Sequence, residues 1–310
     1  MQNQYLPEGL LLTTAQNREA IASQAGLERA MAQGRILEAP AALCDSDMNL
    51  YVDLGNVRGY MPREEVAYCR AGEEVKQIAV ITRVGKPVCF KVIGMREERG
   101  MPTAILSRRA AQLECRTAFL ADLIPGDIIR AKVTHLEQFG AFVDIGCGIP
   151  SLLTVDCISV SRISHPADRF TVGEYIPVVI RSIDRENDRI FVTHRELLGT
   201  WAQNAALFSV GETVRGVVRS IEPYGVFIEL TPNLSGLAEP RADLRPGMAV
   251  SVYIKSILPQ RMKVKLTVID VLAPYDAPTP PRYFITDGHI DEWVYTPACC
   301  DKKIVKTIFG

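Results

Sequence analysis

The stretch Phe139-Gly140-Ala141-Phe142-Val143-Asp144-Ile145 recurs, with conservative changes, as Tyr224-Gly225-Val226-Phe227-Ile228-Glu229-Leu230. Both stretches have the order aromatic, glycine, variable, aromatic, apolar, acid, apolar, and they lie 85 residues apart (139 to 224). Each follows a β-rich run that starts after a glycine, Gly126 in the first copy and Gly211 in the second. Self-similarity at a fixed distance predicts a chain built from repeated units.

A third, weaker copy begins at residues 34–39 and reaches residues 51–55, where only the second aromatic, Tyr51, is kept. The second halves of the other two units also correspond, because residues 172–193 and 246–267 each contain a β-rich run, a turn and a further strand with alternating apolar residues. The spacing is too long for a solenoid repeat. Each unit is therefore expected to be a whole small domain.

Each unit contains about five predicted strands. In the first unit we expect a strand at 78–84, a hairpin turn at Gly85-Lys86, a strand at 88–93 and a last strand near 103–106. Five short strands with glycine in the long first pair favour the Greek-key barrel of the oligonucleotide-binding (OB) class, which closes the sheet and removes its edges. The predicted fold is mainly β, with three tandem five-stranded OB barrels, an N-terminal helix, short linking helices and a small C-terminal element.

The predicted organisation has five segments. They are an N-terminal helical segment (1–33), a degenerate first OB domain (34–116), a second OB domain with linker helices (117–208), a third OB domain (209–272) and a proline-rich linker with a C-terminal tail (273–310). Helices are expected at 14–33, 107–123 and 194–208, the last weakened by Gly199. Residues 273–281 are expected to form a stiff proline-rich linker, and the final thirty residues a small separate element.

Composition indicates a globular chain without a polycationic tail. Lys and Arg number 35 and Asp and Glu number 36, so the net charge is −1, with 47% hydrophobic and 23% charged residues. No apolar run is long enough for a membrane span, and the N-terminus lacks the layout of a signal peptide. The eight cysteines include no C-x-x-C pair, which indicates reduced thiols in a cytoplasmic protein. Cys299-Cys300 with His289 is a candidate metal or redox site, but two plain tail thiols are the simpler interpretation, and no cofactor is expected.

The aromatic-glycine-x-aromatic motif is the main functional signal. Residues at i and i+3 of a regular strand point to opposite faces, and a glycine between them permits a bulge that brings both rings to one surface. Two exposed rings on a curved sheet can stack single-stranded bases, which contributes ~1–3 kcal/mol per base. The alternative interpretation places the rings in the barrel core.

Unit two resembles an S-one RNA-binding domain, the repeat of the bacterial ribosomal protein S-one family. The resemblance is carried by residues 139–146, Gly173-Glu174, Ile183-Asp184 and Arg189-Ile190. All three units resemble this domain over residues 34–272, and the chain is similar to short members of the family. The resemblance implies a five-stranded OB barrel that holds single-stranded RNA, often at the ribosome.

The family's usual RNA-facing set is two aromatics, a histidine, an acid and a basic residue. In unit two the resemblance assigns this set to Phe139, Phe142, Asp184 and Arg189. The histidine position holds Thr154, so that contact is missing, and His165 in the following loop is either a substitute or a plain loop residue.

Unit three keeps the two aromatics, Tyr224 and Phe227, and the basic residue, Lys263. Its acid position holds Leu258, and its histidine position falls near Glu239. These departures favour sequence-independent binding. Two further candidates for RNA contact are Tyr51 in unit one and Lys132 in unit two. His135 and His194 lie in or beside strands and are expected to be structural.

The charge of the units predicts weak phosphate attraction. Residues 34–116 carry 13 basic and 11 acidic side chains (net +2), residues 125–200 carry 8 and 10 (net −2), and residues 209–272 carry 8 and 6 (net +2). Each unit is therefore expected to bind RNA only at micromolar concentration, whereas linked units would hold a strand better through effective concentration. Unit one, poor in aromatics, is expected to dock on protein, with the small ribosomal subunit as the candidate partner.

Two other classes of function were weighed. An enzyme is not expected, because the chain has no P-loop, no G-x-S-x-G, no H-E-x-x-H and no carboxylate cluster at metal spacing. The second alternative is a protein-binding scaffold whose barrels have lost RNA contact. Burial of the rings of Phe139 and Tyr224 would favour this alternative. The favoured expectation is a cytoplasmic protein that binds single-stranded RNA (mRNA) in translation, with no membrane and no small-molecule substrate as partner.

Overall fold

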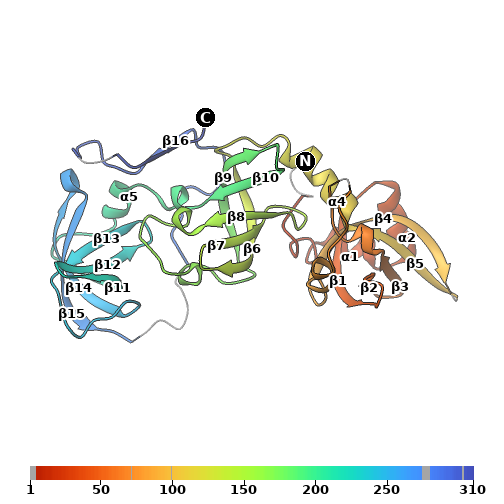
Figure 1. The fold of residues 1–310 in the computed structure, drawn as a ribbon, viewed down its shortest axis with the longest axis horizontal. Coiled ribbons are helices and arrows are strands. Elements are labelled where there is room, and N and C mark those ends of the chain that lie inside the picture. Colours follow the sequence, from red (N-terminus) through yellow and green to blue (C-terminus); the bar gives the residue numbers. More distant parts are fainter. Residues whose placement is uncertain (1–4, 71, 99, 274–279, 302–303) are drawn as a thin grey trace. The chain divides into compact units, whose positions relative to one another are not determined.

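The computed structural model describes residues 5–70, 72–98, 100–273, 280–301 and 304–310. Its strands form three closed five-stranded barrels, which confirms the predicted mainly β, OB-type fold (Figure 1). The barrels occupy residues 37–107, 128–193 and 213–271. In barrels 1 and 3 the third and fifth strands pair in parallel and the other pairs run antiparallel.

The strands of the barrels have the following bounds. Barrel 1 consists of β1 (Leu37–Cys44), β2 (Leu50–Leu54), β3 (Val57–Met61), β4 (Pro87–Glu98) and β5 (Met101–Ser107). Barrel 2 consists of β6 (Ile128–Glu137), β7 (Gly140–Asp144), β8 (Pro150–Thr154), β9 (Tyr175–Asp184) and β10 (Arg189–Thr193). Barrel 3 consists of β11 (Thr213–Glu222), β12 (Gly225–Thr231), β13 (Leu234–Ala238), β14 (Ala249–Leu258) and β15 (Lys263–Val271).

Side chains alternate between the barrel interior and the outer surface. On β2, Leu50, Val52 and Leu54 are buried, whereas Tyr51 and Asp53 between them are not. This two-residue period is the one that a sheet with a single buried face requires.

The described residues form two compact units. The first comprises the chain up to Leu123 together with residues 130–132 and 144–150, and so contains barrel 1. The second comprises residues 124–129, 133–143 and 151–310, and so contains most of barrel 2, barrel 3 and the C-terminal segment.

The N-terminal helix predicted at 14–33 is two helices, α1 (Ala15–Ile21) and α2 (Gln24–Ala32). The break follows from Ser23, whose hydroxyl accepts the backbone N–H of Gly26 at 3.1 Å and so caps the start of α2. The helix predicted at 107–123 is confirmed as α4 (Arg108–Cys115), which a π-helical turn (Arg116–Leu120) continues.

The strand predicted at 78–84 is wrong, because this segment forms the short helix α3 (Gln77–Ile81). In the closed barrel, β1 pairs with β2 on one side and with β4 on the other. Residues 78–84 therefore have no free edge at β1 on which to form a further strand. The helix buries Val80 in the core of barrel 1 while Ile78 and Ile81 stay exposed.

The segment predicted as a helix at 194–208 contains a 3-10 turn (Arg195–Leu198) and helix α5 (Trp201–Ala205), interrupted at Gly199. Gly199 has φ +81°, and a Cβ there would lie 2.5 Å from the ring of Phe284. Further 3-10 turns are Arg63–Glu65, Val155–Cys157, Pro166–Asp168 and Pro259–Arg261.

The C-terminal segment is not the separate element that the sequence predicts. Its strands β16 (Glu292–Val294) and β17 (Lys306–Ile308) pair with each other, and Trp293, Tyr295 and Phe309 are buried in the same core as barrel 3 and α5. The predicted linker 273–281 falls largely on residues 274–279, which lie outside the described residues.

Candidate nucleic-acid interface

Phe139 and Phe142 form an exposed ring pair on barrel 2. Phe139 lies in the turn before β7 and is 54% exposed, while Phe142 points outward from β7 and is partly buried. The two ring centroids are 6.0 Å apart and the ring planes meet at 90°. This edge-to-face contact holds the two rings together at the surface of barrel 2.

Barrel 3 repeats the arrangement with Tyr224 and Phe227. The ring centroids are 6.2 Å apart at 89°, and Tyr224 is 67% exposed. The same geometry therefore occurs at the same motif positions in both barrels. The rings of Phe139 and Tyr224 are both exposed, so the burial that would favour the scaffold interpretation is found at neither.

The glycine of the motif acts through close packing between strands. A Cβ at Gly140 would lie 2.5 Å from the carbonyl oxygen of Leu153, and one at Gly225 would lie 2.7 Å from that of Ala238. In barrel 3 the pairing of β11 with β12 shifts register between Val218 and Ser220. These residues lie on β11, the strand that faces the motif strand β12. Because the first aromatic stands in the turn and not in the strand, the alternation of a regular strand does not separate the two rings.

His135, which the sequence analysis took as structural, is part of the barrel 2 surface. Its ring stacks on Phe142, with centroids 6.4 Å apart and planes at 28°, and its Nε2 lies 2.7 Å from Glu137 Oε1. The side chain is mostly exposed. The sequence contains a signal for this position. Ser220 pairs with Phe227 in barrel 3, and the residue 85 positions before Ser220 is His135. His194, by contrast, is buried, and burial lowers its pKa to about 4.

The second aromatic of each motif belongs to a row of outward-facing side chains that are cross-strand partners on neighbouring strands. This row is called the outer row below. In barrel 3, Phe227 pairs with Leu237, and Leu237 pairs with Lys265. In barrel 2, Leu152 of β8 pairs in the same way with Phe191 of β10. Phe191 thus adds a further aromatic side chain to the outer row of barrel 2, a residue that the motif comparison missed.

Barrel 1 has an aromatic pair of different origin. Tyr51 on β2 and Tyr60 on β3 are register partners, with ring centroids 5.5 Å apart at 60°. The guanidinium of Arg96 lies over the Tyr60 ring, 4.9 Å from its centroid, and the Tyr51 hydroxyl donates to Asp45 Oδ2 at 3.4 Å. The motif comparison missed Tyr60 because this residue lies on β3, outside the stretch that corresponds to the motif. In barrel 1, Tyr60 takes the place of the first aromatic beside Tyr51.

Asp184 and Arg189 face each other across the turn between β9 and β10. The Asp184 carboxylate accepts the backbone N–H of Asn187 at 3.0 Å and its side-chain amide at 2.8 Å, and these hydrogen bonds hold the pKa of Asp184 below its usual value. Asp184 thus shapes the turn that presents the exposed Arg189. Lys263, exposed at the start of β15, has the corresponding place in barrel 3, opposite Leu258.

Lys132 and His165 are held in contacts of their own. The Lys132 ammonium donates to the backbone carbonyl of Glu8 at 2.8 Å. His165 Nδ1 accepts the backbone N–H of Ala167 at 3.0 Å and so caps the turn Pro166–Asp168. We therefore leave both residues out of the proposed RNA surface.

The acid of the repeated motif is buried in barrels 2 and 3 and has a structural role. Asp144 accepts the backbone N–H groups of Glu8 (2.7 Å), Gly146 (2.8 Å) and Gly148 (2.9 Å), and burial, followed by the charge of Glu8, raises its pKa to about 7. Glu229, the corresponding acid of barrel 3, pairs with arginines instead. Neither carboxylate is available to RNA.

The candidate metal site at Cys299, Cys300 and His289 is not assembled in the described part of the chain, where no group of three potential ligands is found. His289 contacts Asp127 at 2.7 Å and Asp291 at 3.4 Å, and the hydrogen bond to Asp127 raises its pKa. Of the helices in the described ranges, none is long and apolar enough to cross a membrane.

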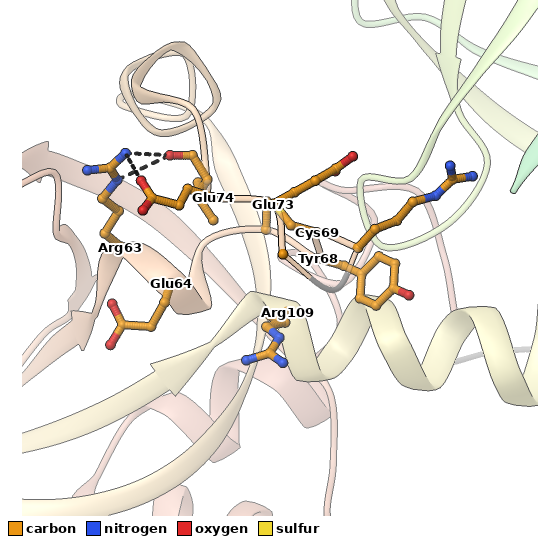
Figure 2. A pocket seen from close by; sticks show the side chains of 11 residues that line it. Arg63, Glu64, Tyr68, Cys69, Glu73, Glu74 and Arg109 are labelled. Atoms are coloured by element: carbon orange, nitrogen blue, oxygen red, sulfur yellow. Dashed lines mark hydrogen bonds and ion pairs between the residues drawn. The ribbon is translucent and has the colours of Figure 1, made fainter. Parts of the chain in front are cut away.

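A pocket of about 610 Å³ on barrel 1 is lined by the connection that follows β3 and by Arg109 of α4 (Figure 2). Its lining contains three arginines and three glutamates, so it has no net charge. Arg63 donates to the backbone carbonyl of Val75 at 2.8 and 3.1 Å and lies 3.8 Å from Glu74. These contacts hold the loop together, and we do not assign this cavity to RNA.

Comparison with known proteins gives consistent matches. Residues 122–195 match the family model described as S1 RNA binding domain. Over 235 residues the chain is 31% identical to small ribosomal subunit protein bS1 of Staphylococcus aureus (strain N315), covering 71% of this chain and 58% of that protein. It is 28% identical over 233 residues to the protein of the same name from Rhizobium meliloti (strain 1021), covering 69% of this chain and 39% of that one. The chain thus spans about half the length of these relatives.

Among solved structures, a multidomain protein with nucleic acid binding domains from Streptococcus pneumoniae is matched over 76% of this chain and 74% of that chain. Its sequence identity to this chain is 13% and the TM-score is 0.25.

Proposed function

Because this chain contains an S1 RNA-binding domain and is related to small ribosomal subunit protein bS1, we propose that it binds single-stranded RNA in translation and is not an enzyme. In this proposal the main RNA surface is on barrel 2, barrel 3 extends it, and the protein acts in the cytoplasm.

The observation that carries the proposal is the repeated ring pair. Phe139 with Phe142 and Tyr224 with Phe227 have nearly the same separation and angle, and the first ring of each pair is more than half exposed. Exposed rings are costly in water unless something covers them, and bases of a single strand have the flat apolar faces that fit. His135 and Phe191 extend this surface on barrel 2.

Binding by any one barrel is expected to be weak, because the units carry net charges of only +2 or −2. Most of barrel 2 and the whole of barrel 3 lie in one compact unit, in which Arg169 and Glu229 form a buried contact between them. A strand that engages both barrels would therefore gain affinity through effective concentration.

We further propose that the partner of barrel 1 is the small ribosomal subunit. Two observations support this. The relatives are named as small-subunit proteins, and the ring pair of barrel 1 is partly covered by Arg96. Barrel 1 is therefore less suited than the other two to stack RNA bases.

The test is a fluorescence-anisotropy titration of a labelled pyrimidine-rich single-stranded RNA at two salt concentrations, with a duplex of equal length for comparison. Phe139→Ala with Phe142→Ala is expected to weaken single-strand binding by at least ~1 kcal/mol, about fivefold in Kd, with the fold intact by circular dichroism. Tyr253→Ala is the matched control, because Tyr253 is a partly exposed ring on β14 outside the pairs.

Binding that prefers the single strand and is weakened in the double variant but not in Tyr253→Ala would support the proposal. Unchanged affinity in the folded double variant would exclude the ring pair as the RNA surface. No binding up to ~100 μM, the weak end of non-specific affinity, would favour the protein scaffold instead.

A further inference from the structure

A second pocket, of about 520 Å³, lies within the second compact unit where the pair of strands β16 and β17, here called the C-terminal hairpin, meets barrel 2. The side chains that line it come from β9, β10, the turn after β10 and β17. They are Arg181, Ser182, Phe191, Arg195, Lys306, Thr307 and Ile308. Its volume is in the range of pockets that take a nucleotide-sized ligand.

The pocket adjoins the outer aromatic row of barrel 2. Phe191 pairs with Ser182 on one side and with Leu152 of β8 on the other. The next strand after β8 is β7, which carries Phe142. A chain that crosses the row from Phe142 toward Phe191 therefore reaches the pocket.

The C-terminal side of the pocket is held in place by a partly buried network of hydrogen bonds. Arg195 Nη2 donates to Thr307 Oγ1 at 3.3 Å, and Thr307 Oγ1 donates to Glu196 Oε1 at 2.7 Å. Arg195 also lies over the ring of Trp293, 5.9 Å from its centroid, and Trp293 is buried in the core that includes barrel 3. The pocket is thus formed before any ligand binds.

Three cationic side chains face this pocket, and one of them has no carboxylate partner. Arg195 pairs with Glu196 at 3.2 Å, and Lys306 pairs with Glu292 at 3.1 Å. The Arg181 guanidinium contacts Cys157 Sγ at 2.9 Å and forms no ion pair in the described part of the chain. Asp156 is the acid nearest in charge effect, since a hydrogen bond from Thr154 and then the charges of Arg181 and Arg195 lower its pKa. The pocket is therefore suited to an anion that Arg181 can bind.

We propose that this pocket holds an internal phosphodiester of the RNA strand whose bases stack on the aromatic row of barrel 2. Arg181 offers the planar donor fork that matches phosphate oxygens, with Lys306 as a second cation and the Ser182 hydroxyl beside them. Phe191 supplies an apolar face for the adjoining base or ribose. The inference rests on the proposed RNA function and makes the C-terminal hairpin part of the RNA-binding surface.

The experiment compares two double variants of the full chain. Arg181→Gln with Lys306→Gln removes two cations from the pocket, and Lys76→Gln with Arg245→Gln removes two exposed cations elsewhere. Binding of oligouridine with a 5′-hydroxyl and, separately, with a 5′-phosphate is measured by anisotropy at several salt concentrations, with the Phe139→Ala, Phe142→Ala chain in parallel. Lys306→Gln alone, at a half-exposed position, serves if the double variant does not fold.

The pocket variant is expected to bind RNA several-fold more weakly than the wild type. The slope of log Kd against log salt concentration should decrease by ~0.7 for each phosphate contact that is lost. The matched control should keep the wild-type slope. An unchanged slope in a folded pocket variant, with RNA binding that still depends on the rings, would overturn the pocket assignment and leave the proposed function standing. A loss seen only with 5′-phosphorylated RNA would overturn the internal position in favour of an end-binding pocket. Failure of the wild type to bind any RNA would overturn both.

Discussion

Arg169, in the connection between β8 and β9, forms a buried ion pair with Glu229 on β12, with Arg169 Nη2 2.5 Å from Glu229 Oε2. Glu229 also accepts Arg219 Nε at 2.8 Å, so one carboxylate bridges two guanidinium groups, and Asp168 lies 3.6 Å from Arg219 as a second acid. The contact is reinforced by Asn233, whose Oδ1 accepts the backbone N–H of Val160 at 2.9 Å. The acid of the repeated motif in barrel 3 thus joins this barrel to barrel 2.

Glu229→Gln is therefore expected to destabilise the second unit strongly. Removal of one partner from a buried ion pair leaves an uncompensated charge, which typically costs ~3–5 kcal/mol. Urea unfolding followed by tryptophan fluorescence measures the effect, since Trp201 and Trp293 both lie in the core of this unit. Asp243→Asn is the matched control, because it breaks an exposed pair with Arg241 and is expected to change little. If the two substitutions lowered the free energy of unfolding equally, the buried contact of Arg169 with Glu229 would contribute no more stability than the exposed pair.

Gly140→Ala is expected to destabilise barrel 2. The added Cβ would lie 2.5 Å from the Leu153 carbonyl oxygen, so a strand must move, and such overpacking costs ~1–3 kcal/mol. Gly94→Ala is the control, since its Cβ would meet the Ile105 side chain at an ordinary 3.7 Å. Urea unfolding of both variants measures the difference, and a neutral Gly140→Ala would contradict the close approach of β7 and β8.

The tyrosine pair of barrel 1 is expected to contribute less to RNA binding than the pair of barrel 2. Arg96 already covers the Tyr60 ring, so a stacked base must first displace that guanidinium. Tyr51→Ala with Tyr60→Ala should therefore lower RNA affinity less than Phe139→Ala with Phe142→Ala in the same anisotropy assay. A larger loss in the tyrosine variant would make barrel 1 the main RNA surface and would contradict the proposal.

Glu38 is expected to make the stability of the first unit fall as the pH rises. Its carboxylate accepts the backbone N–H groups of Gly9, Leu11 and Leu12, but burial raises its pKa from 4.5 to about 7. Between these two values the folded protein keeps a proton that the unfolded chain has already lost. The free energy of unfolding therefore decreases as the pH rises through this window and is independent of this group above it.

Urea unfolding of wild type and Glu38→Gln, measured from pH 5 to pH 8, tests this expectation. The linkage relation allows up to ~1.4 kcal/mol for each pKa unit of the shift. Glutamine does not titrate, so the decline should be shallower in the variant whatever its absolute stability. Parallel curves for the two proteins would show that Glu38 has an ordinary pKa in the fold.

The sequence by itself determined the three barrels and the position of the two ring pairs. The motif repeats after 85 residues, the strands alternate between apolar and polar side chains, and such periodicity is local enough to be found without coordinates. It also indicated the helix that follows barrel 1, where Ser107 caps the first turn.

Only the tertiary structure decided which side chains accompany the rings and what the polar motif positions do. His135 and Phe191 join the surface of barrel 2 because strand pairing places them beside the outer row, and pairing partners are far apart in the sequence. The motif acids Asp144 and Glu229 are structural because distant segments supply their partners. The C-terminal segment belongs to the second unit for the same reason, since burial of Trp293 and Phe309 requires a core that no local pattern describes.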